Sequence, residues 1–426
     1  MATTCRRFAT GNGRIERSYL VTASSCVLTL NSGSSSLKFA VFPVDGAERA
    51  LVQGKAERIG LDGGSFHAKD AEGREVANER QTMADHAGAL DRVLHFVRDA
   101  TPHKPVAVGH RLVRGGVQDQ APQRVTPALL NRMRELIPYL PDHLPHQIAA
   151  IEAVQKFDPS LAQVVAFDTA FHRAMPRVAQ MYALPREFFD DGVLRYGYHG
   201  LSYEYVIGEL ARQAGKEVAR GRVVIAHLGN GCSMAALREG RSVDTTMGFT
   251  PTGGLMMSSR SGDLDPEVIL YLLQRRKLSA AQVSEIVNRK AGLVGVSGGS
   301  SDMRDLLART STDARAEEAV ALFCYQARKF LGGLAAVLGG IDALVFTGGI
   351  GENAPEIRRR ICEGMGHLGL VLDQRANESG ASVISAAGSA ASIRVIPTNE
   401  ELMIARHTIA CIGGDRVSGS TPGATI

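Results

Sequence analysis

Short apolar runs alternate with longer amphipathic stretches along most of the chain. Runs of four to nine residues rich in Val, Ile, Leu and Phe indicate strands, whereas apolar residues that recur every three or four positions indicate helices. Strands are predicted at VLTL, KFAVF, PVAVGHRLV, AQVVAFDT, VVIAHLG, DALVFTGG and ASIRVIPT. Helices are predicted at PALLNRMRELI, SYEYVIGELARQAG, DPEVILYLLQRRK, AAQVSEIVNRK and EEAVALFCYQARKFLGGLAAVL. This alternation predicts an α/β protein in which helices pack against mixed sheets.

Two distant segments share one plan. VLTLNSGSSSLKFAVF (27–42) and VVIAHLGNGCSMAALREGRSV (223–243) each join an apolar strand to a second strand through a polar turn. Turns of this composition present backbone N–H groups and hydroxyls. The plan fits two related domains that face each other across a cleft and offer both turns to one ligand. Two unrelated hairpins would give the same pattern, so turn chemistry alone leaves both interpretations open.

A third polar turn occurs in ALVFTGGIGENAPEIRRRI (343–361), where an apolar strand ends in Gly348, Gly349 and Gly351. A helix is predicted to begin near Ala354–Pro355, with proline in its first turn. Glycines let the backbone approach a ligand closely, and a helix N-terminus favours anions such as phosphates. The chain has neither a GxxxxGK[ST] loop nor a GxGxxG fingerprint. This segment by itself is therefore weak support for a nucleotide site.

Composition narrows the class of protein. The 426 residues include 44% hydrophobic and 22% charged residues, which is typical of a globular protein with two or three domains. The net charge of +4 comes from dispersed basic residues, which argues against a nucleic-acid partner, and no apolar run is long enough to cross a membrane. Six cysteines without metal spacing indicate reduced thiols. Residues 1–25, rich in Arg, Ser and Thr, are expected to be a disordered extension or the product of an early start codon rather than a transit peptide.

Three polar turns and single charged residues within apolar segments fit phosphoryl transfer. That chemistry needs cations and hydrogen-bond donors around the transferred group rather than covalent work by the protein. The candidates are Arg111, Asp168, His199, Arg260, Asp302 and Arg304. Each of them also has a structural interpretation, as a surface ion pair or a satisfied interior histidine.

Ordered motifs then narrow the choice. NSGSSSLK, GHRLVRGG, FDTAFHRAMP, YGYHG, HLGNG, DTTMGFTPTGGL, FTGGIGEN and IPTNEELMIAR resemble those of acetate kinases, in the same order, over about residues 26–410. The resemblance implies two duplicated actin-like (ribonuclease H-like) domains with a nucleotide cleft between them. It divides the chain into domain I, at 26–168 plus 400–426, and domain II, at 169–399. It also implies reversible transfer between ATP and acetate, giving ADP and acetyl phosphate, with Mg²⁺ or Mn²⁺, by a cytoplasmic homodimer.

The resemblance assigns roles to individual residues. The implied catalytic residues are Asp168, His199 and Arg260, and the implied acyl-substrate contacts are Arg111, Val113, His143, Tyr198 and Pro251. The implied nucleotide contacts are Ser34, Ser36, Lys38, His227, Leu228, Gly229, Asn230, Gly231, Asp302, Met303, Arg304, Gly349, Ile350, Gly351, Glu352 and Asn353, and the implied metal residues are Asn31 and Glu400. Because acetate is already ionised near neutral pH, it needs no general base. We therefore expect Asp168 to orient Arg111 or a metal-bound water.

Three residues depart from the family pattern. Arg114 follows the substrate arginine where the family usually has histidine, Asp142 replaces an apolar residue, and Tyr198 replaces phenylalanine. They predict a more polar acyl pocket, with Asp142 turned away from the substrate or paired with Arg114, since an unpaired buried carboxylate would repel acetate.

Other functions fit less well. Propionate kinases share nearly all of these motifs, so the acyl group stays open. A sugar kinase would need a general base for its neutral hydroxyl acceptor and would lack the ordered motifs. A non-catalytic ATP-dependent switch would have lost Arg111, His199 and Arg260, which are all present.

Overall fold

The computed structural model describes residues 25–33, 35–46, 48–141 and 143–413. Predictions for Ser34, Asp142 and the first 24 residues therefore lie outside the described residues. The first sheet of this part has eight strands in the order β5-β4-β3-β2-β1-β6-β8-β7. Their bounds are β1 (Cys26–Ser32), β2 (Ser36–Pro43), β3 (Val52–Glu57), β4 (Ser65–Asp70), β5 (Glu75–Arg80), β6 (Pro105–Leu112), β7 (Gln123–Arg124) and β8 (Ala162–Phe167).

The second sheet repeats the inner part of the first. Among the described residues it has five strands in the order β11-β10-β9-β12-β13. Their bounds are β9 (Val223–Leu228), β10 (Cys232–Arg238), β11 (Arg241–Thr245), β12 (Ala343–Thr347) and β13 (Ser392–Val395). In both sheets an antiparallel hairpin, β1–β2 or β9–β10, continues into two strands parallel to its first member. This repeat confirms the duplicated α/β architecture, and it excludes two unrelated hairpins.

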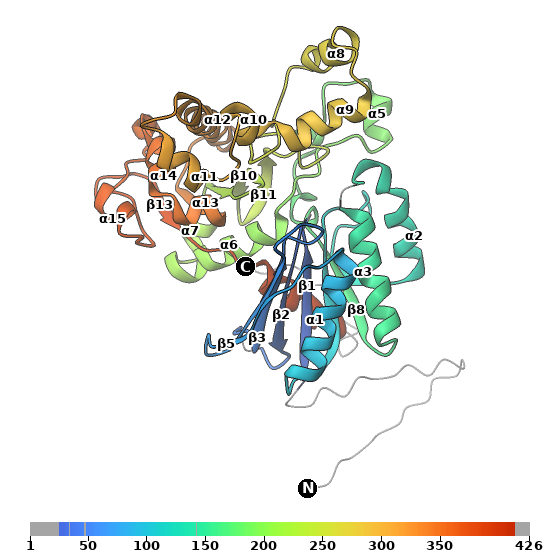
Figure 1. Ribbon diagram of the computed structural model, residues 1–426. Coiled ribbons are helices and arrows are strands. Elements are labelled where there is room, and N and C mark those ends of the chain that lie inside the picture. Colours follow the sequence, from blue (N-terminus) through green and yellow to red (C-terminus); the bar gives the residue numbers. More distant parts are fainter. Residues whose placement is uncertain (1–24, 34, 47, 142, 414–426) are drawn as a thin grey trace.

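Helices cover both faces of each sheet (Figure 1). On the first sheet, α1 (His86–Ala100) and α3 (Leu144–Phe157) pack against the face that carries Leu28, and α16 (Glu400–Gly413) packs against the face that carries Val27. On the second sheet, α12 (Ala314–Leu338) covers one face and α6 (Gly200–Ala214) the other. These faces differ because successive strand side chains point in opposite directions.

Shorter helices connect these layers. They are α2 (Pro127–Glu135), α4 (Arg177–Gln180), α5 (Arg186–Asp190), α7 (Lys216–Arg220), α8 (Pro266–Gln274), α9 (Ala280–Glu285), α10 (Gly292–Ser297), α11 (Met303–Arg309), α13 (Gly348–Asn353), α14 (Pro355–Cys362) and α15 (Gln374–Glu378). No helix in the described part of the chain is long and apolar enough to span a membrane. The five described cysteines are free thiols.

The predicted strands and helices are all present, and the sequence missed others. Strand β5 has only exposed or half-buried residues, so it lacks the apolar alternation that marks a strand. The helix predicted near Ala354–Pro355 is preceded by another, α13, which begins directly after β12. This early start is possible because Gly348 has φ of +76°, and a Cβ there would lie 2.8 Å from the Leu228 carbonyl oxygen.

Candidate active site

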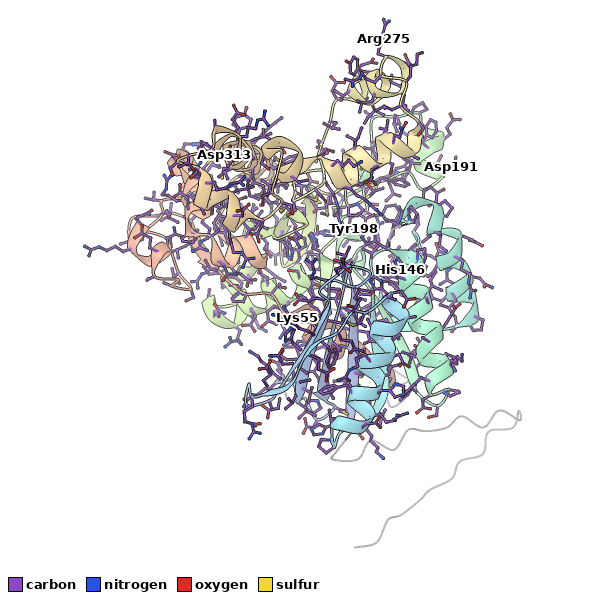
Figure 2. The ribbon with its side chains drawn as sticks, viewed as in Figure 1. Lys55, His146, Asp191, Tyr198, Arg275 and Asp313 are labelled. Carbon is purple, nitrogen blue, oxygen red and sulfur yellow. The ribbon has the colours of Figure 1, made fainter. Side chains whose placement is uncertain are left out.

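The smaller of two neighbouring cavities lies where the carboxyl ends of central strands of both sheets converge. The smaller, of about 180 Å³, is lined by Asn31, Gly33, Ser36, Lys38, Arg111, His199, His227, Asn230, Gly231 and Glu400. The larger, of about 540 Å³, is lined by Ser35, Pro138, Tyr139, Leu140, Pro141, His143, Thr250, Pro251, Thr252, Ser259, Arg260, Ser284, Asn288 and Arg289. Gly231 lies between them, because a Cβ there would be 3.2 Å from His199 Nε2 and 3.6 Å from Arg260 Nη1. Figure 2 shows Tyr198 in this region, between the two halves of the molecule.

Arg111 is held by a buried carboxylate. At the end of β6, its Nε donates to Asp168 Oδ1 over 3.0 Å, and its Nη2 donates to Asp168 Oδ2. Burial disfavours the charge of Arg111, but Asp168 and Glu400 outweigh this effect and raise its pKa. Burial raises the pKa of Asp168, and the Arg111 guanidinium opposes that shift. Because both Asp168 oxygens bind Arg111, the geometry favours an orienting role for Asp168 over proton transfer.

Asn31 and Glu400 lie beside this pair. Asn31 Nδ2 donates to Glu400 Oε2 over 2.9 Å, and Arg111 Nη1 donates to Asn31 Oδ1 over 3.4 Å. Burial favours the neutral form of Glu400, but Arg111 and His227 outweigh it and lower the pKa of the carboxyl. An ionised carboxylate and an amide oxygen fit Mg²⁺, which binds through one or two protein oxygens and otherwise keeps waters and phosphate oxygens.

His199 presents its Nε2 to the cavities. It directly precedes α6 and has left-handed φ and ψ of 60° and 26°. Its Nδ1 lies 2.8 Å from Ser233 Oγ, and the Tyr203 hydroxyl lies 2.5 Å from that oxygen. Burial lowers the pKa of His199 well below its usual range, and the nearby His227 adds to this effect. The imidazole is therefore neutral, and with Ser233 donating to Nδ1 its Nε2–H can donate to a ligand.

The second glycine-rich turn supports this histidine. His227, at the end of β9, stacks on His199 with ring centroids 4.1 Å apart, and its Nδ1 lies 2.8 Å from Ser202 Oγ. The adjacent turn closes with a 3.1 Å bond from the Gly229 N–H to the Gly231 carbonyl. The backbone of this turn lies beside the pocket that also contains Lys38 and Ser36 from the first turn. The two related turns thus face one cavity.

The remaining predicted nucleotide residues line neither of these two cavities. Glu352 accepts the Gly348 N–H over 2.9 Å, and Asn353 Nδ2 donates to the Gly349 carbonyl, so both side chains shape their own turn. Asp302 caps α11 by accepting the Arg304 N–H over 2.8 Å, and it also pairs with the Arg304 guanidinium. Met303 is buried in the core. Their contacts with a nucleotide stay predictions.

The predicted acyl contacts divide into two groups. His143, Pro251 and Arg260 line the larger cavity, and Arg260 Nη1 donates to the Pro251 carbonyl over 3.0 Å. Val113 and Tyr198 do not line either of the two cavities, because both side chains are buried behind their walls. The Tyr198 hydroxyl, expected to make the acyl pocket more polar, donates instead to the Phe249 carbonyl over 2.8 Å.

A family model and several curated relatives match the sequence of this chain. The model described as the acetokinase family matches residues 26–406. An acetate kinase of Methylocella silvestris is 47% identical over 401 residues, covering 91% of this chain and 98% of that protein. One of Rhodopseudomonas palustris, strain TIE-1, is also 47% identical, covering 92% of this chain and all of the other. This chain belongs to the acetokinase family. As a member, it is a phosphotransferase whose acceptor is a carboxyl group.

Solved structures confirm the fold. The acetate kinase of Porphyromonas gingivalis has a TM-score of 0.81 at 38% identity, covering 91% of this chain and all of that one. A propionate kinase of Francisella tularensis has a TM-score of 0.84 at 35% identity, covering 90% and 99%. The two-domain actin-like fold that the motifs predicted is thereby confirmed.

Sequence reasoning missed the residues that support the family motifs. Ser233 and Tyr203 fix the His199 ring, and Glu401 accepts a 3.2 Å bond from Asn31 Nδ2. Glu401 stands next to Glu400 in the quoted motif, and Ser233 follows HLGNG by two positions. Their proximity in sequence was the signal that could have found them. Tyr203 carries no such signal, because its spacing marks it as a core residue of a helix.

Three buried histidines and the half-buried His199 are expected to make stability depend on pH. Burial lowers the pKa of His110, His172 and His227 to about 4, and it lowers that of His199 well below its usual range. In the unfolded chain a histidine has its ordinary pKa of about 6.5, so below that pH the unfolded state binds more protons than the folded state. Stability is therefore lost as pH falls from about 6.5 towards 4. At pH 5 each histidine with a folded pKa of about 4 costs about 2 kcal/mol.

We therefore expect a lower Tm at pH 5 than at pH 7.5 in thermal unfolding. The variant His110→Gln should flatten this dependence, because it removes one buried titrating ring. The control His367→Gln, at an exposed position, should not change it. Equal Tm values for the wild type at both pH values would contradict the assignment of neutral buried rings.

Proposed function

We propose that this acetokinase family member is an acetate kinase that reversibly transfers a phosphoryl group between ATP and acetate. The observation that carries this proposal is the placement of Arg111. It is a permanent cation, fixed by Asp168, beside the cavity that His199, Lys38 and the two polar turns line. A fixed guanidinium is suited to bind a carboxylate through two parallel hydrogen bonds.

The remaining cleft residues supply the other requirements of the reaction. Acetate enters as the anion and attacks the γ-phosphorus of ATP directly, while the P–O bond to ADP breaks. Arg111 holds the acetate carboxylate, and His199 Nε2–H and the Arg260 guanidinium stabilise charge on the phosphoryl oxygens in flight. This division fits their convergence at Gly231, on either side of the junction between the cavities. Donors fixed before the reaction stabilise developing charge without reorganising.

The nucleotide and metal assignments rest on the family motifs. Lys38, Ser36 and His227 to Gly231 face the ATP phosphates, while Asp302 to Arg304 and Gly349 to Asn353 form the nucleoside side. Glu400 and Asn31 would hold Mg²⁺, which would supply positive charge to offset that of the phosphates. Domain I (26–168 with 400–426) and domain II (169–399) close over the substrates. Closure excludes water, so that acetyl phosphate forms in place of hydrolysed ATP.

The test is ATP-dependent acyl phosphate formation, trapped with hydroxylamine, across formate, acetate, propionate, butyrate and glycolate. We expect acetate to have a kcat/KM at least about tenfold above the others, the discrimination that one methylene group can supply. A preference for propionate would replace acetate with the substrate named for the Francisella relative. No activity with any carboxylate would overturn the proposed function.

A homodimer is part of the proposal, and α8 supports it. This helix is rich in apolar residues, yet none of them is buried in the monomer, and it stands out from the second half of the molecule (Figure 1). Val268 and Tyr271 are 41% and 51% exposed. Apolar surface gathered on one projecting helix is typical of a protein interface, and a second copy supplies a matching surface.

We expect the mass from light scattering to be twice that of the chain. The variant Tyr271→Glu should shift the population to monomer, because it would bury a charge at the interface. The matched control Tyr325→Glu replaces another exposed tyrosine, on α12, and should leave the dimer intact. A monomeric wild type would contradict the homodimer.

We place the protein in the cytoplasm, where ATP and reduced thiols such as its five described cysteines coexist.

A further inference from the structure

Arg114 is buried in an unusual way. Its side chain is 2% exposed, and among the described residues no carboxylate pairs with it. The guanidinium carbon lies 3.7 Å from the ring centroid of Tyr196 and 4.6 Å from that of Phe249. Buried arginines are normally paired with acids, because desolvating an unpaired charge is costly. Aromatic faces and carbonyl oxygens offset part of this cost here.

Arg114 binds the Phe249 carbonyl, and other side chains also bind the backbone of Phe249. Arg114 Nη1 donates to the Phe249 oxygen over 3.1 Å, and the Tyr198 hydroxyl donates to the same oxygen over 2.8 Å. The Phe249 N–H in turn donates to the Tyr182 hydroxyl over 2.7 Å. Since Phe249 lies outside any strand or helix, these side chains replace the backbone partners that regular structure would provide. Arg114 and Tyr198, both departures from the family pattern, thus meet at one atom.

The residues that follow Phe249 form a wall of the larger cavity. Thr250, Pro251 and Thr252 line it, and the Pro251 carbonyl accepts the 3.0 Å bond from Arg260. The segment 249–252 is therefore anchored by Arg114 and Tyr198 at one end and by Arg260 further along. Any shift of Phe249 would move the surface that faces the acyl substrate.

Space for such a shift exists behind this wall. A separate cavity of about 320 Å³ is lined by Arg114, Tyr139, Tyr196 and Phe249, among others. Tyr139 lines both this cavity and the larger cavity of the candidate active site. The wall is thus one aromatic layer thick, with Arg114 on its far side.

We infer that Arg114 is a positioning residue that keeps the segment 249–252 from receding and thereby sets the length of acyl chain that the enzyme accepts. The inference rests on the proposed function. A pocket discriminates against an extra methylene group only when its wall cannot give way, since a yielding wall accommodates the larger substrate. The Tyr198 hydroxyl acts on the same carbonyl and reinforces the effect.

The test compares kcat and KM for acetate, propionate and butyrate in the wild type, Arg114→Gln, Tyr198→Phe and the control Arg134→Gln. Arg134 is 46% exposed on α2 and binds Asn131 and Glu152, away from the wall. In Arg114→Gln we expect the ratio of kcat/KM for propionate over acetate to rise about tenfold. Most of this change should come from KM for the carboxylate rather than from kcat. Tyr198→Phe should shift the ratio about threefold in the same direction, with KM for ATP unchanged within about twofold. The control should leave all of these values unchanged.

Outcomes separate this inference from the function on which it rests. An active wild type with unchanged acyl selectivity in Arg114→Gln and Tyr198→Phe would overturn the positioning role alone. An inactive wild type would overturn the proposed function and the inference with it. If thermal unfolding shows that Arg114→Gln is not folded, the test rests on Tyr198→Phe, which removes only one hydroxyl group. An unchanged selectivity ratio in that variant overturns the inference, and the predicted shift supports it.

Discussion

The variant Asp168→Asn is expected to lower kcat/KM for acetate by about 10² to 10³, because Asp168 fixes the guanidinium that is proposed to hold the acetate carboxylate. An asparagine can accept one hydrogen bond from Arg111, but its amide N–H groups face the guanidinium as donor against donor. Arg111 then loses the nearer of two counter-charges, the other being Glu400 at 4.0 Å, and the contact that fixes its orientation. The measurement is steady-state kinetics across pH 6 to 9.

The shape of the pH profile separates the two roles of Asp168. If it orients Arg111, the variant's profile has the same shape as that of the wild type at a lower level. Loss of the acidic limb would identify a general base. The control is Asp119→Asn, which removes another buried aspartate that pairs with an arginine, Arg132, at 2.9 Å. It should lower stability while keeping kcat/KM within about threefold, as Asp119 lines neither cavity of the candidate active site. A fully active Asp168→Asn enzyme would contradict both roles.

The variant His199→Gln is expected to lower kcat by about 10² to 10³, the usual effect of removing one fixed donor to a developing anion. KM for acetate should change by less than about threefold, because the interaction forms with the phosphoryl group in flight rather than with bound acetate.

The matched control for His199 is His110→Gln. His110 is buried, with its Nε2 2.8 Å from Gln163 Oε1, and it lines neither active-site cavity. This variant should keep kcat within about twofold. A rise in KM with unchanged kcat in His199→Gln would place the imidazole in ground-state binding and contradict its assigned role.

Much of the fold could be predicted from the chain because its signals are local. Strands such as β1 and β9 are continuous apolar runs, and helices such as α12 repeat apolar residues at helical spacing. Edge strand β5 could not be predicted, since a strand with little buried surface needs no apolar alternation. The early start of α13 was missed because it depends on the close approach of Gly348 to Leu228, which lies far away in sequence.

The sequence by itself determined the family, the duplicated plan and the identity of the residues with suitable chemistry, because ordered motifs and periodicity are written along the chain. Tertiary structure alone decided which contacts these residues make. It directs both Asp168 oxygens to Arg111, and it turns the Tyr198 hydroxyl away from the acyl cavity to the Phe249 carbonyl. The physical reason is that hydrogen bonds and burial depend on neighbours in space, and for these side chains the neighbours lie more than fifty positions away along the chain.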